Sequence, residues 1–200
     1  MLRVGLTGGI GSGKSTVANI FRDTFSIDVI DADIIAHELT QAEKPAVKDI
    51  VERFGDDVLQ NNGQLDRKKL RQRVFENPEE RSKLEAILHP QIRAEIDSQT
   101  NDVHSKYCII AIPLLIESGM QDLVDRILVV DCAEEHQIAR ASQRDGNKRI
   151  DVEKIVAAQL PRQERLSYAH DIIDNSGNIA ALEQKVSDLH KLYQSLDRPT

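Results

Sequence analysis

The chain has 200 residues and a formal net charge of −7, with 40% hydrophobic and 30% charged residues. This length suits one compact domain or a core with an inserted lobe, and the negative charge argues against nucleic acid as a partner. The longest apolar run, 108–116, is too short to cross a bilayer, and glycines interrupt any apolar signal segment at the N-terminus. Cys108 and Cys132 lie in separate apolar segments without the spacing of metal ligands. We therefore expect a cytoplasmic protein with two buried thiols and no membrane segment.

The first motif lies near the N-terminus, where residues 8–15 read GGIGSGKS and fit the phosphate-binding P-loop. An apolar run at 4–6 precedes it, and apolar residues at helical spacing follow it over 17–21. In such a loop the backbone N–H groups point into one concavity, and the following helix adds partial positive charge. Lys14 would reach the β- and γ-phosphates, and Ser15 would give an oxygen to Mg²⁺. The motif predicts binding of ATP or GTP.

Apolar runs along the chain indicate an α/β fold. Short runs rich in β-branched residues recur between helical patterns, at residues 4–6, 27–30, 107–112, 127–130 and 171–173. Such runs suit strands that are buried on both faces of a parallel sheet, with ligands at the carboxyl ends of the strands. We therefore predict a P-loop NTPase-type parallel five-stranded sheet flanked by helices.

Two stretches interrupt this alternation of strands and helices. Residues 35–104 contain helical patterns and no convincing strand, which predicts an inserted helical lobe that binds an acceptor, and residues 134–165 predict a basic helical lid. The nucleotide-binding core then comprises residues 1–34, 105–133 and 166–200. This plan is typical of small-molecule kinases, which must exclude water from phosphoryl transfer.

The predicted lid is locally basic, with seven Lys or Arg against four acids from Arg140 to Arg165. Arg140 and Arg144 lie four positions apart on one face of the predicted helix, and their guanidinium groups suit phosphate oxygens. The alternative is an exposed helix face on which Arg144 pairs with its neighbour Asp145. Arg162 and Arg165 either extend the basic patch or face solvent.

Carboxylates follow two of the predicted strands. The stretch VIDAD ends the second strand with Asp31 and Asp33, and a carboxylate there could take the proton of an attacking hydroxyl or bind Mg²⁺. We prefer Asp33 for this role, although the helical pattern after it also makes it a natural N-cap. Asp131 ends a later strand, but Glu134 lies three residues beyond it, and this spacing favours a capping box.

Two further stretches have no assigned role from the residues alone. In LHPQIR, His89 precedes Pro90, which is typical of a helix boundary. DRKKLRQR, at residues 66–73, packs five basic residues into eight positions. This segment either receives a second phosphate group of the acceptor or forms an exposed helix face.

Seven stretches resemble the dephospho-CoA kinase family, in the same order: LTGGIGSGKSTVAN, VIDADIIAH, FGDDVL, LHPQIR, IPLLIESG, QIARASQRD and DIIDNSG. The resemblance covers residues 6–177, nearly the whole chain. It implies that the chain uses ATP, with Mg²⁺, to phosphorylate the ribose 3′-hydroxyl of dephospho-CoA, which is the last step of CoA synthesis.

The same resemblance implies roles for particular residues. It gives Asp33 as the base, with Lys14 and Arg140 as further catalytic residues. The residues expected to bind ATP are Gly9, Gly11, Ser12, Gly13, Lys14, Ser15, Thr16, Arg140 and Asn175. The residues expected to contact or support the acceptor are Asp33, His89, Arg93 and Glu117. The lid tip GNKRI, at 146–150, does not match the family pattern.

The sequence also leaves two alternative functions to compare with this one. A kinase for another small molecule, such as a nucleoside monophosphate, would share the P-loop, the base and the lid. A nucleotide-dependent switch would usually show Asn-Lys-x-Asp, but Asn147 and Lys148 are followed by Arg149 and Ile150. The long helical insertion also fits an acceptor pocket better than a short switch loop.

Overall fold

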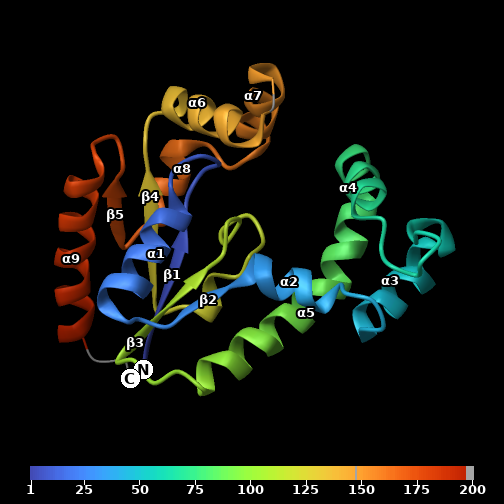
Figure 1. Cartoon of the computed structure of the whole chain (residues 1–200), viewed down its shortest axis with the longest axis horizontal. Coiled ribbons are helices and arrows are strands. Elements are labelled where there is room, and N and C mark those ends of the chain that lie inside the picture. The colour runs from blue at the N-terminus through green and yellow to red at the C-terminus, as the bar shows by residue number, and fades with distance from the viewer. Residues whose placement is uncertain (147, 197–200) are drawn as a thin grey trace. The chain divides into compact units, whose positions relative to one another are not determined.

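The computed structural model describes residues 1–146 and 148–196, so Asn147 of the predicted lid tip lies outside the described residues. The chain divides into two compact units. The sheet unit comprises Met1–Asp31 together with the chain from Asp102 onward, and the helical unit comprises Ala32–Asn101. Figure 1 shows the strands gathered in the first unit and helices throughout the second.

The described part of the sheet unit contains a five-stranded sheet, in the order β2-β3-β1-β4-β5, in which every pairing is parallel. The strands are β1 (Leu2–Thr7), β2 (Val29–Asp31), β3 (Tyr107–Ala111), β4 (Arg126–Asp131) and β5 (Asp171–Asp174). Each strand lies at a predicted apolar run, and the predicted fold class is confirmed. The strand order reverses at β1, and α/β proteins bind ligands beyond the carboxyl ends of the strands at such a point.

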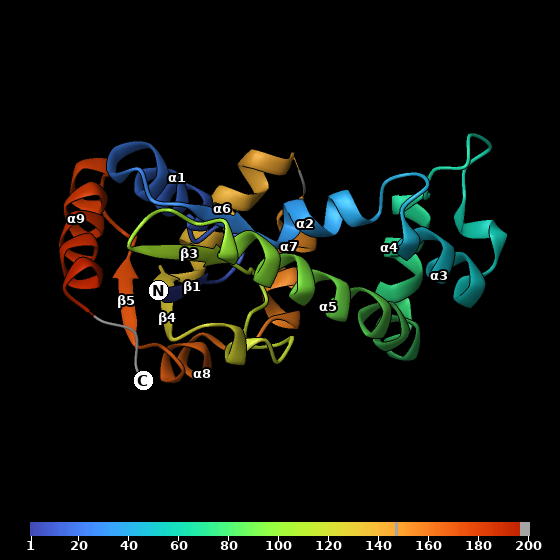
Figure 2. The same ribbon diagram turned by 90° about the horizontal axis from the view of Figure 1, so that it is seen from below.

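Helices α1 (Lys14–Phe25) and α9 (Ile179–Ser195) pack on each other and share the core on one face of this sheet (Figure 2). Leu6 of β1, Phe21 of α1 and Val186 of α9 are completely buried in that core. Alternate residues of a strand point to the same face, so each strand contributes every second side chain to it. The apolar spacing over residues 17–21 predicted α1.

The rest of the sheet unit consists of η2 (Gln121–Leu123), α6 (Glu134–Asp145), α7 (Arg149–Ala158) and α8 (Arg162–Ser167). Helices α6 and α7 pack on each other through a small apolar cluster that includes Ile138 and Val152. Ile10, in the loop before α1, packs against the same cluster. The chain between β4 and β5 is therefore attached to the loop that follows β1.

The helical unit consists of α2 (Ala32–Leu39), α3 (Pro45–Phe54), η1 (Asp56–Val58), α4 (Arg67–Glu76) and α5 (Pro78–Asn101). Its apolar core is formed by Val47, Ile50, Phe54, Val58, Leu65 and Leu70. An isolated antiparallel bridge joins Leu59 to Leu65. This unit thus has a core of its own, separate from that of the sheet.

Helix α5 corrects one expectation from the sequence. The predicted helix boundary at His89 is wrong, because α5 runs through Pro90 without ending. Proline removes one backbone hydrogen bond and normally destabilises a helix interior. Here Pro90 is exposed, while Ile92 and Ile96 beyond it are buried, so packing of the second half of the helix outweighs that loss.

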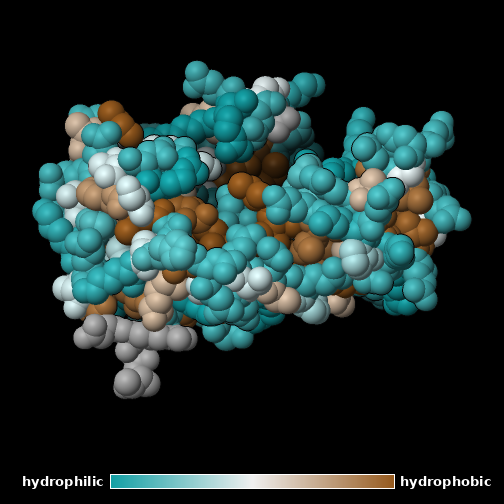
Figure 3. Space-filling model, turned by 60° about the horizontal axis from the view of Figure 1, so that its bottom comes forward, coloured by the Kyte–Doolittle hydropathy of each residue, from teal (hydrophilic) through white to brown (hydrophobic). Residues whose placement is uncertain are grey.

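The surface and the cysteines agree with the composition. Within the described ranges, no helix is long and apolar enough to cross a membrane. The face drawn in Figure 3 is mostly hydrophilic, with apolar patches between the polar side chains. Cys108 and Cys132 are buried and free, as predicted, and burial raises the pKa of Cys108 to about 11.

Candidate active site

The loop between β1 and α1 has the backbone of a phosphate-binding loop. Gly11 and Gly13 adopt φ values of 69° and 100°, a region in which other residues are strained. The N–H of Val17 donates to the carbonyl oxygen of Gly13 at 3.1 Å, which leaves the amides of Ser15 and Thr16 without an intrahelical partner. Unbonded N–H groups at a helix start are donors that phosphate oxygens accept from.

Two side chains of this loop add further donors. Nζ of Lys14 donates to the carbonyl oxygens of Gly8 and Gly9, at 2.6 and 2.9 Å. Ser12 is completely buried, and its hydroxyl oxygen has no hydrogen-bond partner in the structure. A buried hydroxyl without a partner is rare, and a bound oxyanion would satisfy it. The loop therefore fits a nucleotide phosphate group.

The glycines also let the loop approach other parts of the sheet unit. A Cβ on Gly9 would lie 2.1 Å from Oε1 of Gln137 on α6. A Cβ on Gly13 would lie 2.2 Å from Nδ2 of Asn175, just after β5. The sequence motif explains the glycines by the approach of phosphate, and the structure adds these two internal contacts.

Arg140 and Asn175 meet beside this loop. Nη2 of Arg140 donates to the backbone oxygen of Asn175 at 3.0 Å, and Nδ2 of Asn175 donates to the backbone oxygen of Ser12 at 2.7 Å. Nη1 of Arg140 lies 3.9 Å from Sγ of Cys132, and burial raises the pKa of that thiol, so the thiol stays neutral. The structure thus brings together the loop, Arg140 and Asn175, all of which were expected at the ATP site.

The arginines between residues 134 and 165 differ in their ion partners. Within the described residues, Arg140 forms no ion pair with a carboxylate, whereas the other four do. The pairs are Arg144 with Asp145 (2.6 Å), Arg149 with Glu135 and Glu153 (both 2.7 Å), Arg162 with Asp131 (2.7 Å) and Arg165 with Glu117 (4.0 Å). The alternative considered for Arg144, a surface pair with its neighbour, is the one observed. The guanidinium of Arg140 therefore lies beside the loop without a carboxylate partner among the described residues.

Asp131 differs from its sequence prediction. The N-cap of α6 is Ala133, so the predicted capping box is wrong. Asp131 instead accepts two hydrogen bonds from Arg162, from Nε at 2.8 Å and Nη2 at 2.7 Å, which raises the pKa of Arg162. A bidentate pair between ionised groups is stronger than a single bond to a backbone amide, and it holds the carboxylate at the end of β4.

Glu117 lies in the turns after β3, where Oε1 accepts the N–H of Leu160 at 3.1 Å. Its neighbour Arg165 is only 5% exposed and donates to the backbone oxygen of Leu160 at 2.6 Å. Neither of the two expectations for Arg165, an anion-facing patch or solvent, is correct. Glu117 and Arg165 together anchor the segment between α7 and α8.

Sequence reasoning missed two glutamines at the loop. Oε1 of Gln159, after α7, accepts the N–H of Ile10 at 3.0 Å. Gln137 is 2% exposed, and its Nε2 donates to the backbone oxygen of Cys132 at 3.0 Å. A glutamine within a charged helical pattern is normally an exposed residue, so the sequence contains no signal for either contact.

The helical unit contains the other expected residues. Asp33 lies in the first turn of α2, which starts at Ala32, so Asp33 is not the N-cap that its spacing also allowed. A carboxylate in a first turn interacts favourably with the helix dipole. His89 and Arg93 lie four positions apart on one side of α5, and α2 packs against α5. These three residues therefore lie on two adjacent helices, while Glu117 belongs to the sheet unit.

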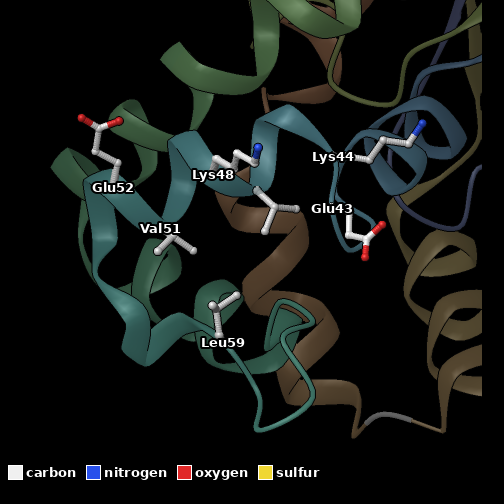
Figure 4. Close-up of a pocket in the computed structure, with 7 residues that line it drawn as sticks. Glu43, Lys44, Lys48, Val51, Glu52 and Leu59 are labelled. Carbon is white, nitrogen blue, oxygen red and sulfur yellow. The ribbon is translucent and has the colours of Figure 1, made fainter.

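The helical unit also has a pocket of about 400 Å³. It is lined by Val47, Val51 and Leu59 together with Glu43, Lys44, Lys48 and Glu52. In Figure 4 the carboxylate of Glu52 points away from Val51 and Leu59. The pocket is apolar inside, and none of the expected acceptor residues lines it.

The donor set at the loop suits Mg²⁺ that arrives with phosphate. Ser15 offers an exposed hydroxyl at the start of α1. No group of three or more His, Cys, Asp or Glu among the described residues is arranged to hold a metal. Mg²⁺ in such sites takes few protein ligands and keeps water and phosphate oxygens, so a single hydroxyl is a fitting contribution.

The fold and this loop define a P-loop protein of the kinase type. A sequence model of the family described as dephospho-CoA kinase matches residues 2–181. The dephospho-CoA kinase of Acinetobacter baylyi is 49% identical over 193 residues, which cover 96% of this chain and 98% of that protein. The chain belongs to the dephospho-CoA kinase family, so the predicted family and the prediction of a kinase are confirmed.

Solved structures agree with this membership. The crystal structure of TT1252 from Thermus thermophilus has a TM-score of 0.84 and 29% identity, covering 96% of this chain and 97% of that one. Dephospho-CoA kinase from Campylobacter jejuni has a TM-score of 0.68 and 28% identity, covering 94% and 95%. The similarity therefore extends over both units of the chain.

Proposed function

We propose that this chain transfers the γ-phosphate of ATP to the ribose 3′-hydroxyl of dephospho-CoA, giving CoA and ADP in the last step of CoA synthesis. Family membership supports the choice of acceptor. The observation that carries the donor site is the state of Arg140, which is hydrogen-bonded to Asn175 and has no ion pair within the described residues. An unpaired guanidinium beside a P-loop suits the charge that develops on a transferring phosphoryl group.

The donor half of the mechanism uses the loop and its neighbours. The amides and side chains of residues 9–16, with Arg140 and Asn175, bind ATP, and Lys14 interacts with the β- and γ-phosphates. Ser15 gives one oxygen to Mg²⁺, which supplies charge neutralisation when bound. In other P-loop enzymes, an arginine that stabilises the transferring phosphoryl group raises kcat by ~10³–10⁵-fold.

The acceptor half uses residues 35–104 as the acceptor-binding lobe and 134–165 as the lid. Asp33 takes the proton of the 3′-hydroxyl. The oxygen of that hydroxyl attacks the γ-phosphorus of ATP, and ADP leaves. His89, Arg93 and Glu117 contact the acceptor or support the site. Support for Asp33 comes from its place two residues after the end of β2, in the first turn of α2. Both substrates are metabolites of the cytoplasm, where we place the reaction.

The proposed function is tested by measuring ADP release from Mg·ATP with a panel of acceptors. The panel comprises dephospho-CoA, adenosine, AMP, CMP and no acceptor. We expect turnover with dephospho-CoA, with a product phosphorylated at the 3′ position by mass spectrometry and phosphorus NMR. Turnover with a nucleoside monophosphate instead would keep the kinase and change the acceptor. Hydrolysis that no acceptor stimulates would contradict the proposal.

The role of Asp33 is tested by the variant Asp33→Asn. The amide keeps the size of the side chain and cannot accept the proton, so we expect kcat to fall by about 10²–10⁴-fold while ATP affinity stays unchanged. Binding of a fluorescent ATP analogue and circular dichroism provide the controls for the donor site and for folding. Near-normal turnover would show that the carboxylate of Asp33 is not the base.

A further inference from the structure

Helix α4 contains most of the basic segment 66–73, and the structure divides its five basic residues into two groups. Three of them hold the helical unit together. Arg67 donates to the backbone oxygens of His37 and Thr40 (3.0 and 3.2 Å), Lys69 pairs with Asp57 (3.0 Å), and Arg73 pairs with Glu80 (2.7 Å). These three are therefore explained by the fold of the unit itself.

The other two, Lys68 and Arg71, are exposed and make no hydrogen bond or ion pair with any described residue. They are separated by three positions, and Phe75 follows four positions later, so the three side chains lie on one face of α4. Leu70, on the opposite side of the helix, is buried in the core of the unit. We call Lys68, Arg71 and Phe75 the outer face of α4.

Phe75 is the unusual member of this face. It is 67% exposed, more than any other large apolar side chain among the described residues. Beside the two cations, the exposed ring offers a flat apolar surface that charged side chains alone do not provide. The nearest carboxylate on the helix, that of Glu76, already accepts a hydrogen bond from Gln72 at 3.0 Å. The outer face thus combines two cations with a flat apolar ring.

This combination matches the chemistry of a nucleotide. An aromatic ring stacks on a base, and lysine and arginine bind phosphate oxygens. We propose that the outer face of α4 binds the adenine and diphosphate end of the acceptor, with the base on Phe75 and the diphosphate on Lys68 and Arg71. This inference rests on the proposed function, because it takes dephospho-CoA as the acceptor.

The alternative occupants fit less well. The phosphates of ATP are assigned to the loop before α1, in the sheet unit. The pantetheine arm of the acceptor is uncharged and would leave both cations without a partner. The adenosine diphosphate end offers a base and two anionic groups together, which matches all three side chains.

Steady-state kinetics with four variants tests this assignment. Phe75→Leu keeps an apolar side chain and removes the ring, Phe75→Tyr keeps the ring, and Lys68→Gln with Arg71→Gln removes both charges. Arg53→Gln is the matched control, since Arg53 is an exposed arginine on α3 without an ion partner among the described residues. Circular dichroism checks that every variant folds.

We expect Phe75→Leu and the double variant each to raise the KM for dephospho-CoA by about 5- to 100-fold, the range for losing a base stack or a phosphate contact. The KM for ATP and kcat should stay unchanged, and Phe75→Tyr and Arg53→Gln should behave as wild type. The KM for dephospho-CoA should also rise less with salt in the double variant than in wild type.

Three outcomes would overturn the assignment. An unchanged KM for dephospho-CoA in both test variants would refute the outer face while leaving the proposed function intact. An equal rise in this KM in Arg53→Gln would show that the net charge of the helical unit affects binding and that the outer face has no specific role. A raised KM for ATP would assign the face to the donor nucleotide. If wild type shows no turnover, the proposed function fails, and calorimetric titration of dephospho-CoA into the same variants still decides whether the face binds it.

Discussion

Arg140 and Arg144 lie four positions apart on α6, but their hydrogen-bond and ion partners differ. Arg144 donates to both oxygens of Asp145, at 2.6 and 2.7 Å, and these hydrogen bonds raise its pKa. Arg140 donates to a backbone oxygen of Asn175 and faces a neutral thiol. Their spacing alone places both arginines on one helix face. Their ion partners distinguish them, because Arg144 is paired with Asp145 and Arg140 is available to phosphate.

This difference predicts unequal effects of the same substitution. Arg140→Gln should lower kcat by about 10³-fold or more, because it removes the guanidinium charge at the developing phosphate charge. Arg144→Gln, the matched control, should change kcat less than about twofold, since exposed ion pairs contribute little. Initial rates at saturating ATP and dephospho-CoA measure both. Equal losses of kcat in the two variants would mean that both arginines contribute to the reaction, whether or not they form an ion pair.

The residues at the loop show how far sequence reasoning reaches. Lys14 and Ser15 could be predicted because the P-loop is a local motif, in which spacing along the chain determines geometry. Gln137, Gln159 and the partner of Asp131 could not, because their contacts join segments that are distant in sequence. A glutamine has no distinctive spacing, and Asp131 matched a local capping pattern that its long-range partner Arg162 overrides.

At the scale of elements, the strands could be predicted and one helix could not. Strands β1, β3 and β4 are apolar and almost wholly buried, and such strands are visible in the sequence as apolar runs. In the edge strand β5 only Ile173 is buried, and its apolar run is correspondingly shorter. Pro90 is misleading in the sequence, because proline usually indicates a helix end although α5 continues through it. What maintains α5 is the burial of Ile92 and Ile96 against other elements, which no local pattern reveals.

The segment from α6 to Gln159 contacts the P-loop through apolar packing and through a hydrogen bond. The side chain of Ile10 packs on the cluster shared by α6 and α7, and its N–H donates to Gln159. Gln137 of α6 occupies the space that a Cβ on Gly9 would need. We therefore expect a displacement of α6 or α7 to disturb the loop, which would couple the proposed lid to the phosphate site.

At the scale of the whole molecule, the two units have separate cores and separate proposed tasks. The sheet unit holds the loop, Arg140 and Asn175, and the helical unit holds Asp33, the α5 residues and the outer face of α4. The interiors differ as well: the strands of the sheet unit include many completely buried side chains, whereas α3 and α4 surround a small cluster. Local stability in proteins follows such differences in burial.

This division predicts where each ligand slows amide hydrogen exchange. A bound ligand protects the segments it contacts, because it stabilises their closed state. ADP with Mg²⁺ should slow exchange in peptides from the loop before α1 and from α6 at concentrations that leave α4 unchanged. Dephospho-CoA should slow exchange in α4 and α5. Strands β1 and β3 should be slow in every state because nearly all of their residues are buried. Mass spectrometry of peptides from free and bound protein measures this, and Lys14→Ala provides the control that should lose only the ADP effect. Protection of α4 by ADP at the concentrations that protect the loop before α1 would contradict the separation of donor and acceptor sites between the two units.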